Sequence, residues 1–466
     1  MRPCGRPPKS AALATGHVTS TTPSLPVERY HDNVVLFNVS HWQEGDLVTI
    51  DAFVPPNVPT DLPAAIRETK RELRARIGDY AGAFAHVEEK MRNEVAEIID
   101  LRAQGDPVWP IVQFSDIAAG TVSEETRALI RRRGCAIVKG NFERERAEAW
   151  DAELASYLDE NYFFNQYRNE DDGFFATVEN AKPSIFPIYW SRPQIEARQD
   201  DNMALTRRFL NSFWQHESEG RVWFDPTRDT HYPDRIRRRP PGTNSKGLSP
   251  HTDAGSVERW LTPEYQGVFR KVFDGRIDEY DPWDGAYRSE AMEYNVARRC
   301  SAFRTFQGWT ALSEMAPTQG VLHAIPIPDA MSYQILRALQ DDTADDELCG
   351  AAPAQTMPTT EKWHPEIWAA LTAIPAVEPG DTVWWHGDLV HAVGPVQDQV
   401  GWGNVMYIPA SPWCEKNVAY AKACGDDFIR GTSPRDFAHE DYEVNWTGRA
   451  TLADLNERGR RQLGLD

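Results

Sequence analysis

Apolar residues recur at helical spacing along the first part of the chain. Between residues 61 and 105 they stand three, four or seven positions apart, at Ile66, Leu73, Ile77, Tyr80 and Phe84. This periodicity predicts an amphipathic helix, and Asp61 is a residue type that caps a helix start. Residues 123–132 and 143–160 show the same pattern. We therefore expect two further helices, with Gly134 and a strand at 135–140 between them.

The pattern changes to short apolar runs between residues 243 and 412. Pro-Gly and Gly-Asp pairs separate the runs, which are HTD (251–253), SAFRTFQGWTAL (301–312), GVLHAIPIP (320–328), VEPGDTVWWHGDLVHAV (377–393) and GWGNVMYIPASP (401–412). Runs of this length with such turns predict a mostly β core, either a sandwich or a jelly roll. Residues 254–300 interrupt the core as a partly helical insertion, and residues 413–466 are expected to wrap around it as helix and loop.

These patterns divide the chain into three parts. Residues 1–30, rich in Pro, Ser and Thr, predict a disordered tail. Residues 31–115 predict a largely helical N-terminal extension. Residues 116–466 predict a single domain built around the 243–412 core. Mixed helical and β-rich segments of this kind indicate an α+β protein overall.

Charge narrows the range of partners. The formal net charge is −20, which argues against nucleic acid and against an anionic membrane surface. No apolar run approaches the roughly 18 residues of a membrane-spanning helix. Two basic runs stand out, at 131–133 and 235–239. A solvated or ion-paired patch is the ordinary interpretation of both, but the second lies twelve residues before His251, so a role in binding an anionic substrate stays open.

The cysteines indicate a reducing compartment. Six are present, none in a Cys-x-x-Cys motif, and no secretory signal precedes them. A cytoplasmic location fits best. Residues 1–27 contain Arg2, Arg6 and Lys9 but no acid, which makes a mitochondrial transit peptide the alternative.

Three His-x-Asp pairs offer candidate metal ligands: His251/Asp253, His386/Asp388 and His439/Asp441. In an extended strand, residues i and i+2 point to the same face. Two His and one carboxylate form the open-faced site of non-haem iron(II) oxygenases. After His251 and Asp253, such a site needs a second His from a strand farther along the chain.

His391 and His386 compete for that place. His391 lies near the predicted end of the 377–393 strand, whereas His386 is expected in the middle of it. Sites in small barrels lie at the mouth, where strands end, which favours His391. A triad of His386, Asp388 and His439 is a less favoured alternative, because the segment around His439 lacks a Gly-Asp strand entry.

Taken in order, HTD, GWTALSEMAPTQGVLHAIP and PGDTVWWHGDLVHAVGP resemble the iron(II)/2-oxoglutarate-dependent dioxygenases, in the branch that includes phytanoyl-CoA hydroxylase. The similarity is greatest to a bacterial and fungal group within that branch and covers residues 245–412. It implies a double-stranded β-helix (jelly-roll) fold. It implies that His251, Asp253 and His391 bind iron(II) at the catalytic centre. It also implies that 2-oxoglutarate and O2 are consumed, with release of succinate and CO2, to hydroxylate a small molecule.

One feature departs from that family. Its members usually carry an Arg or Lys nine to twelve residues after the distal His, which pairs with the far carboxylate of 2-oxoglutarate. Here residues 400–403 read Val-Gly-Trp-Gly, and the first basic residue after His391 is Lys416. Arg304 is the candidate replacement because a guanidinium can bind a carboxylate as a fork, and Lys246 is the next.

Gln307 and Asn404 are the polar residues expected to line the co-substrate pocket. The missing basic residue also leaves two alternatives open: a metal-binding jelly roll with another co-substrate, and a non-catalytic barrel that binds a metabolite. The primary substrate and the oligomeric state are not indicated.

Overall fold

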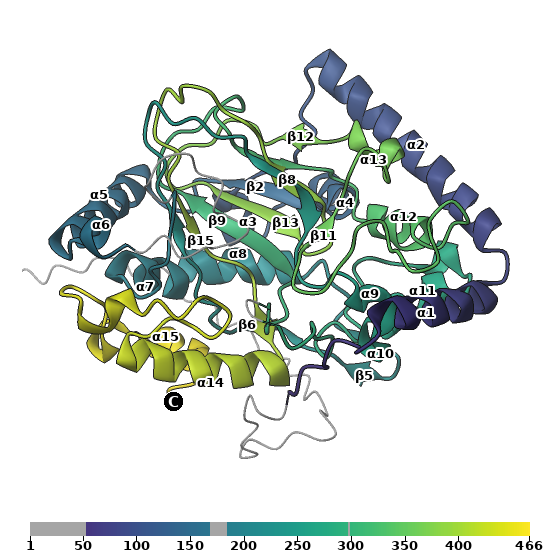
Figure 1. Cartoon of the computed structure of the whole chain (residues 1–466). Helices are drawn as coiled ribbons and strands as arrows, with labels where there is room; N and C mark the ends of the chain where they lie inside the picture. Colours follow the sequence, from purple (N-terminus) through teal and green to yellow (C-terminus); the bar gives the residue numbers. More distant parts are fainter. Residues whose placement is uncertain (1–52, 168–183, 297–298) are drawn as a thin grey trace, which may run out of the picture. The chain divides into compact units, whose positions relative to one another are not determined.

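Two β-sheets made largely from the predicted β-rich region form the centre of the fold (Figure 1). The computed structural model describes residues 53–167, 184–296 and 299–466. The larger sheet has seven strands in the order β1-β2-β13-β9-β15-β7-β3, and the smaller has five in the order β11-β8-β14-β10-β12. Their pairings are antiparallel except for β1 with β2. Over the described residues these sheets stay separate, with no closed barrel, so the fold is mixed α+β with several sheets.

The strands are short, as the sequence pattern predicts. The larger sheet contains β1 (Ile111–Gln113), β2 (Cys135–Lys139), β3 (Ile185–Phe186), β7 (Ile236–Arg237), β9 (Phe306–Ala311), β13 (Thr382–His386) and β15 (Val405–Tyr407). The smaller contains β8 (Leu248–Thr252), β10 (Leu322–Ala324), β11 (Met357–Pro358), β12 (Thr372–Ala373) and β14 (His391–Val393). Two-stranded pairs join β4 (Glu217–Ser218) to β5 (Arg221–Val222), and β6 (Asp225–Asp229) to β16 (Pro412–Trp413).

The predicted helix over 61–105 is present but broken. It forms α1 (Leu62–Ile77) and α2 (Tyr80–Gln104), which lie at one side of the fold, where α1 packs on other helices of the same side and α2 runs past the helices that cover the smaller sheet (Figure 1). The Asp61 side chain accepts a hydrogen bond from the Ala64 amide, as expected for a cap. Gly78 ends α1 with a positive φ of 79°, a conformation that glycine adopts without strain. The sequence prediction missed this break.

The next predicted helix, strand and helix are confirmed. Ser123 caps α4 (Glu124–Arg133) by accepting from the Thr126 amide. Gly134 ends that helix in the left-handed conformation, and β2 follows directly. The helix expected at 143–160 is α5 (Arg144–Glu160).

Helices also fill the segments outside the core strands. Before the core stand α3 (Phe114–Ala119), α6 (Phe163–Gln166), α7 (Arg192–Gln199) and α8 (Asp201–Asn211). The predicted insertion contains α9 (Glu258–Leu261), α10 (Pro263–Val268), α11 (Arg270–Phe273) and η2 (Ile277–Glu279). Between the core strands lie α12 (Ala330–Arg337) and α13 (Pro365–Trp368). The C-terminal segment contains α14 (Glu415–Arg430), η3 (Tyr442–Asn445), η4 (Leu452–Asp454) and α15 (Glu457–Gln462).

Alternation along the central strands gives the larger sheet two apolar faces. On one face, Trp309, Val383 and Val405 share a cluster with Leu322 and Ala324 of the smaller sheet. The other face packs Phe306, Trp384 and Met406 against the helical layer in a second cluster. The space between the two sheets is therefore the apolar interior toward which Trp309 and its neighbours point.

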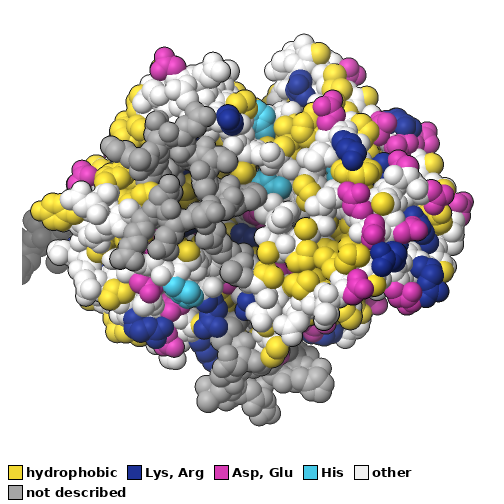
Figure 2. All heavy atoms as spheres, in the orientation of Figure 1, with side chains coloured by type: hydrophobic (Ala, Val, Ile, Leu, Met, Phe, Trp, Pro, Cys, Tyr) yellow, Lys and Arg dark blue, Asp and Glu magenta, His cyan; other side chains and the backbone are white. Residues whose placement is uncertain are grey.

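Acidic and basic side chains mix on the surface. Over α1 in Figure 2 they intermingle, and Arg67 and Arg74 there pair with Asp346 and Asp345. No described helix is long and apolar enough to cross a membrane. The described residues belong to one compact unit, Glu44–Asp466. The predicted tail at residues 1–30, with its possible transit signal, lies outside the described residues.

Candidate metal centre

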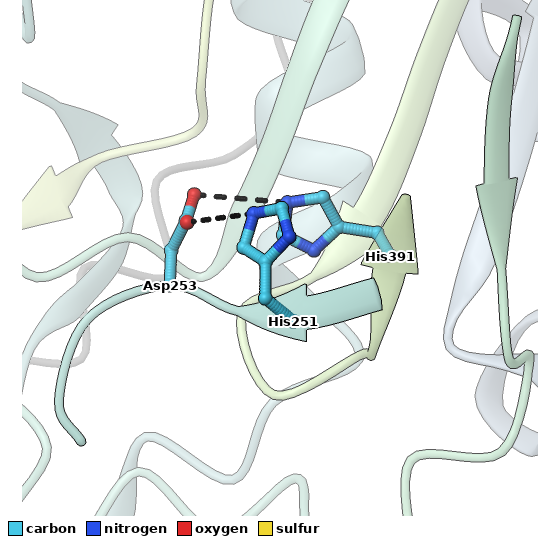
Figure 3. Close-up of side chains that lie close together, drawn as sticks. All are labelled: His251, Asp253 and His391. Atoms are coloured by element: carbon cyan, nitrogen blue, oxygen red, sulfur yellow. Dashed lines mark ion pairs between the residues drawn. The ribbon is translucent and has the colours of Figure 1, made fainter. Parts of the chain in front are cut away.

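His251, Asp253 and His391 converge in the structure (Figure 3). His251 lies on β8 and His391 on β14, where they are direct register partners. Asp253 lies just past the end of β8, and its carboxylate faces both imidazoles. Its oxygens are 3.3 Å from His251 Nε2 and 3.7 Å from His391 Nε2. One ligand atom from each residue lies within 4.8 Å of the others.

The hydrogen bonds of the two imidazoles fix which nitrogen faces the carboxylate. Nδ1 of His251 contacts the Ser249 carbonyl at 2.7 Å, and Nδ1 of His391 contacts the Leu389 carbonyl at 3.1 Å. A carbonyl oxygen only accepts, so each Nδ1 carries the proton. In the neutral ring, Nε2 then holds the lone pair that a metal needs.

The charges of the site favour the same protonation state. Burial lowers the pKa of His391 to about 4, and the neighbouring His251 adds to the effect. Burial alone would raise the pKa of the Asp253 carboxyl, but its close contact with His251 and the nearby side chains of His391 and Arg304 hold it well below its usual range. His391 is therefore a neutral imidazole and Asp253 an ionised carboxylate near neutral pH.

Arg259 holds the backbone that carries Asp253. Its guanidinium donates to the carbonyls of Asp253 at 3.2 Å, Ala254 at 3.1 Å and Gly255 at 3.0 Å. The same group forms a 3.0 Å ion pair with Asp388, three residues before His391. A buried cation thus ties the segment of Asp253 to the segment that leads to His391.

Asp388 is the acidic member of the rival His386-Gly-Asp388 motif. It is buried and also forms a 2.7 Å ion pair with Arg288. The charges of Arg288 and Arg259 outweigh burial and hold the pKa of this carboxyl below its usual range. Its role in the structure is to join two arginines.

His386 is occupied at both ring nitrogens. Nε2 contacts the Pro282 carbonyl at 3.0 Å, and Nδ1 accepts from the Asp388 amide at 3.0 Å. The ring stacks on Trp214 with centroids 4.5 Å apart, on the helical side of the larger sheet. No lone pair is left for a metal. Among the described residues, the His251–Asp253–His391 group is the one cluster of three or more potential ligands, so the alternative triad with His439 is not assembled.

The prediction that His391 lies near the end of a strand and His386 in the middle of it was wrong. Residues 377–393 do not form one strand: β13 ends at His386, a short connection follows, and β14 begins at His391 in the other sheet. His391 therefore starts a strand and His386 ends one. The change of sheet, rather than a position at one strand's end, separates the two histidines.

Two of the four predicted co-substrate residues, Gln307 and Arg304, lie in the part of the fold that contains the triad. Gln307 is buried in β9 opposite Trp385, whose ring is 5.3 Å from that of His391. The Arg304 guanidinium lies over the Tyr232 ring at 5.1 Å. No described residue forms a hydrogen bond or ion pair with it. Burial works against the charged form, but Cys300, Tyr232 and Asp253 together raise the pKa of Arg304.

The other two residues are placed elsewhere. Lys246 is exposed and precedes β8 by two residues. Asn404 is buried, and its side chain donates to the Asp151 carboxylate at 3.0 Å and accepts from the Arg239 amide at 3.1 Å. Its hydrogen-bonding groups are therefore used within the fold. The structure does not bring either residue to the triad.

Sequence reasoning missed the supports of the site. Arg259 follows Asp253 by six residues, and nothing in its local pattern indicates the pairing with Asp388. Trp385 lies in the apolar run 377–393, and nothing in that run indicates that its ring packs beside His391. Its buried indole nitrogen has no hydrogen-bond partner in the described structure. The contact of Arg259 with Asp388 and that of Trp385 with His391 both join segments that are brought together by the fold. No local sequence pattern indicates such contacts.

Comparison with known proteins identifies the family. The Gig2-like family model matches residues 60–465. The chain belongs to the Gig2-like family. The Escherichia coli (strain K12) protein YbiU is 54% identical over 416 residues, which cover 89% of this Gig2-like chain and 99% of YbiU.

Solved structures of similar proteins share the fold. The crystal structure named "Putative Oxidoreductase from Salmonella typhimurium LT2" is 54% identical, with a TM-score of 0.85, over 89% of this chain and 100% of that one. The structure of GlcNAc Inducible Gene 2 from Candida albicans is 24% identical, with a TM-score of 0.72, over 89% of this chain and 91% of that one. The second likeness concerns the fold alone.

Proposed function

We propose that this protein is a non-haem iron(II)/2-oxoglutarate-dependent dioxygenase that hydroxylates a small molecule and releases succinate and CO2. The observation that carries the proposal is the convergence of His251, Asp253 and His391, with both Nε2 atoms turned to the carboxylate. Two His and one carboxylate with open positions is the ligand set of non-haem iron(II) oxygenases. The name of the Salmonella relative, which calls it an oxidoreductase, agrees with this class.

The donor set fits a metal of this kind. Donor atoms that bind one ion at about 2.1 Å and at right angles lie about 3 Å apart. The two Asp253 contacts, at 3.3 and 3.7 Å, are close to that spacing. The two Nδ1–H groups bond to carbonyls, which holds both rings in orientation. His251, Asp253 and His391 would hold the iron, and iron with 2-oxoglutarate would supply the oxidising chemistry.

The fold supports the proposal as well. The triad projects from the five-stranded sheet, and Trp385 and Gln307 approach it from the seven-stranded sheet. Two antiparallel sheets that share an apolar interior, with the ligands on neighbouring strands of one sheet, are the arrangement expected of a jelly roll. Protein groups on both sheets would then surround the bound co-substrate and limit the access of water.

The test is an anaerobic titration of metal-free protein with iron(II) and then 2-oxoglutarate, monitored by the weak visible absorption band of the chelate. His391→Ala should lose the band, because a ligand is removed. His386→Gln is the matched control: it changes a neighbouring histidine outside the triad, and the band should remain.

Two outcomes would count against the proposal. Stoichiometric iron binding without a band would indicate a metal protein with another co-substrate, a candidate favoured by the lack of a basic residue at 400–403. A band that survives His391→Ala and disappears in His386→Gln would place the metal elsewhere.

A further inference from the structure

The basic run at 235–239 covers β7 and the two residues after it, and its side chains divide between two faces. Arg238 forms a 2.9 Å ion pair with Asp151 of α5. Arg237 and Arg239 have the opposite parity, and both approach Gly403 of the neighbouring segment. Arg237 Nε donates to its carbonyl at 3.0 Å, and the Arg239 guanidinium faces the position that a Gly403 Cβ would take. The two arginines therefore share a face that Arg238 does not.

Both of these guanidiniums are buried without a carboxylate. Arg237 is 7% exposed and Arg239 3% exposed. Arg237 Nη2 contacts Met315 Sδ at 3.4 Å. Arg239 Nη2 donates to the carbonyls of Gln319 and Gly320, both at 2.7 Å, while its Nε is buried without a partner. Neither arginine forms an ion pair with any described carboxylate.

Three other buried arginines of this chain are neutralised, whereas Arg198, which is 1% exposed, bonds to the carbonyls of Tyr189 and Asp234 and to His231. Arg133, Arg207 and Arg259 contact carboxylates at 2.7, 2.6 and 3.0 Å. By contrast, burial lowers the pKa of Arg237, and burial with repulsion from Arg237 lowers the pKa of Arg239 to about 9. Two neighbouring buried cations without a counter-charge are unfavourable, and a bound anion would offset that cost.

The location of the pair corresponds to the missing basic residue. Gly403 is twelve residues after His391, at the end of the 400–403 segment. A Cβ at Gly403 would lie 3.3 Å from Nε and Nη2 of Arg239. The guanidinium of Arg239 thus lies beside the backbone position from which the absent side chain would extend.

The pair also lies within reach of the metal centre. Arg237 is opposite Val405, and Val405 is opposite Ala311 of β9. Gln307, four residues earlier on β9, lies opposite Trp385 beside His391. Four strand residues span about 13 Å, and the two-strand step from β9 to β7 adds about 10 Å across the sheet, so the backbones of Arg237 and Gln307 are about 16 Å apart. An arginine side chain and an extended five-carbon dicarboxylic acid together have about that length.

We propose that Arg237 and Arg239 bind the carboxylate of 2-oxoglutarate that is remote from the metal, so that β7 supplies the cation absent from 400–403. The inference rests on the proposed function. A guanidinium binds a carboxylate through paired N–H donors, which gives both strength and orientation. On this assignment, Arg304 is not the residue that holds that carboxylate.

The test measures two affinities of the full chain by calorimetry: Mn(II) for the metal site, and 2-oxoglutarate for the Mn(II)-loaded protein. Arg239→Gln and Arg237→Gln should each weaken 2-oxoglutarate binding about 100-fold, the loss expected for charge-assisted bonds in a buried site. Mn(II) affinity should be unchanged. Arg238→Gln, on the opposite face, is the matched control and should bind 2-oxoglutarate as wild type does.

A relocated cation provides a rescue that a folding defect would not allow. Gly403 has no positive φ, and a Cβ there would lie 3.0 Å from Gln399 Nε2, so a side chain fits once Arg239 is shortened and the end of the Gln399 side chain moves aside. In the Arg239→Gly background, Gly403→Arg should restore most of the 2-oxoglutarate affinity. Melting temperatures of all variants show whether each is folded.

The outcomes separate this inference from the proposed function. Unchanged 2-oxoglutarate affinity in both Gln variants overturns the inference alone, and a loss in Arg304→Gln instead would identify the other cation. Wild type that binds Mn(II) but not 2-oxoglutarate overturns both. If wild type binds no Mn(II), the melting temperature is measured with added succinate instead. Stabilisation of wild type by succinate that Arg239→Gln abolishes supports the carboxylate site. No stabilisation of wild type by succinate overturns the inference.

Discussion

At the scale of single residues, His391 and His386 differ in what their ring nitrogens contact. His391 uses Nδ1 on a carbonyl and turns Nε2 to Asp253, whereas His386 has both nitrogens bonded within the fold. Five residues separate them, and their side chains lie on opposite sides of the larger sheet. The hydrogen-bond partners, rather than the residue type, decide which imidazole can bind a metal.

Asp388 supplies a residue-scale prediction. Asp388→Asn removes the charge shared by buried Arg259 and Arg288, and loss of one partner from a buried ion pair costs about 3–5 kcal/mol. We expect urea unfolding to show a destabilisation of about that size. Mn(II) affinity should also fall, because Arg259 holds the backbone of Asp253.

A substitution at an exposed aspartate serves as the control for Asp388→Asn, because it also removes one carboxylate charge. Asp341 is 82% exposed and lies 3.8 Å from Arg74, so Asp341→Asn should change neither stability nor Mn(II) affinity appreciably. Equal behaviour of the two variants would contradict the role assigned to Asp388.

At the scale of elements, the connection from β13 to β14 creates the site. It takes the chain from the seven-stranded to the five-stranded sheet and starts β14 at His391, opposite His251. At the entry to β13, Gly380 has a φ of 92°, and a Cβ there would lie 2.2 Å from the Phe142 carbonyl. The predicted Gly-Asp turn is thus fixed by a close approach of two backbones.

Gly308 supplies an element-scale prediction. It lies in β9 opposite Trp384 of β13, and a Cβ at Gly308 would lie 2.4 Å from the indole ring. Gly308→Ala should therefore destabilise the protein by about 1–3 kcal/mol, as overpacking does. Urea unfolding measures the effect.

A double-mutant cycle tests the cause. If the clash is responsible, Trp384→Leu should cost less in the Gly308→Ala background than in wild type, because the smaller side chain relieves it. Additive effects of the two substitutions would exclude direct contact as the reason.

At the scale of the whole molecule, buried neutral histidines make stability depend on pH. Burial lowers the pKa of His386 and of His364 to about 3 each. Between that value and an unfolded value near 6.5, the unfolded chain binds protons that the folded chain does not. The stability contributed by each group is therefore complete above about pH 6.5 and is lost as pH falls toward 3.

The predicted slope can be measured. Each group should add about 1.4 kcal/mol per pH unit to the fall in the free energy of unfolding across this window. His386→Gln removes the titrating ring, so its stability should decline less steeply with acid than that of wild type in urea unfolding between pH 7 and 4. Identical slopes would show that His386 is already protonated in the folded state.

The sequence by itself determined the features that depend on near neighbours. Asp61 and Ser123 cap helices, Gly134 ends one, and the runs after residue 243 form short strands, because capping, φ preference and side-chain periodicity act over a few residues. The three residues of the triad could also be listed from the sequence, because the His-x-Asp pair and a later histidine are visible in it.

Tertiary structure alone decided how those pieces meet. The exchange of sheets between His386 and His391, the Arg259–Asp388 link and the approach of Arg239 to Gly403 all join segments that are distant in sequence. Strand pairing and burial set these contacts, and both depend on which distant strands become neighbours. The ligand types were therefore readable from the chain, but their geometry and charge state come from the fold.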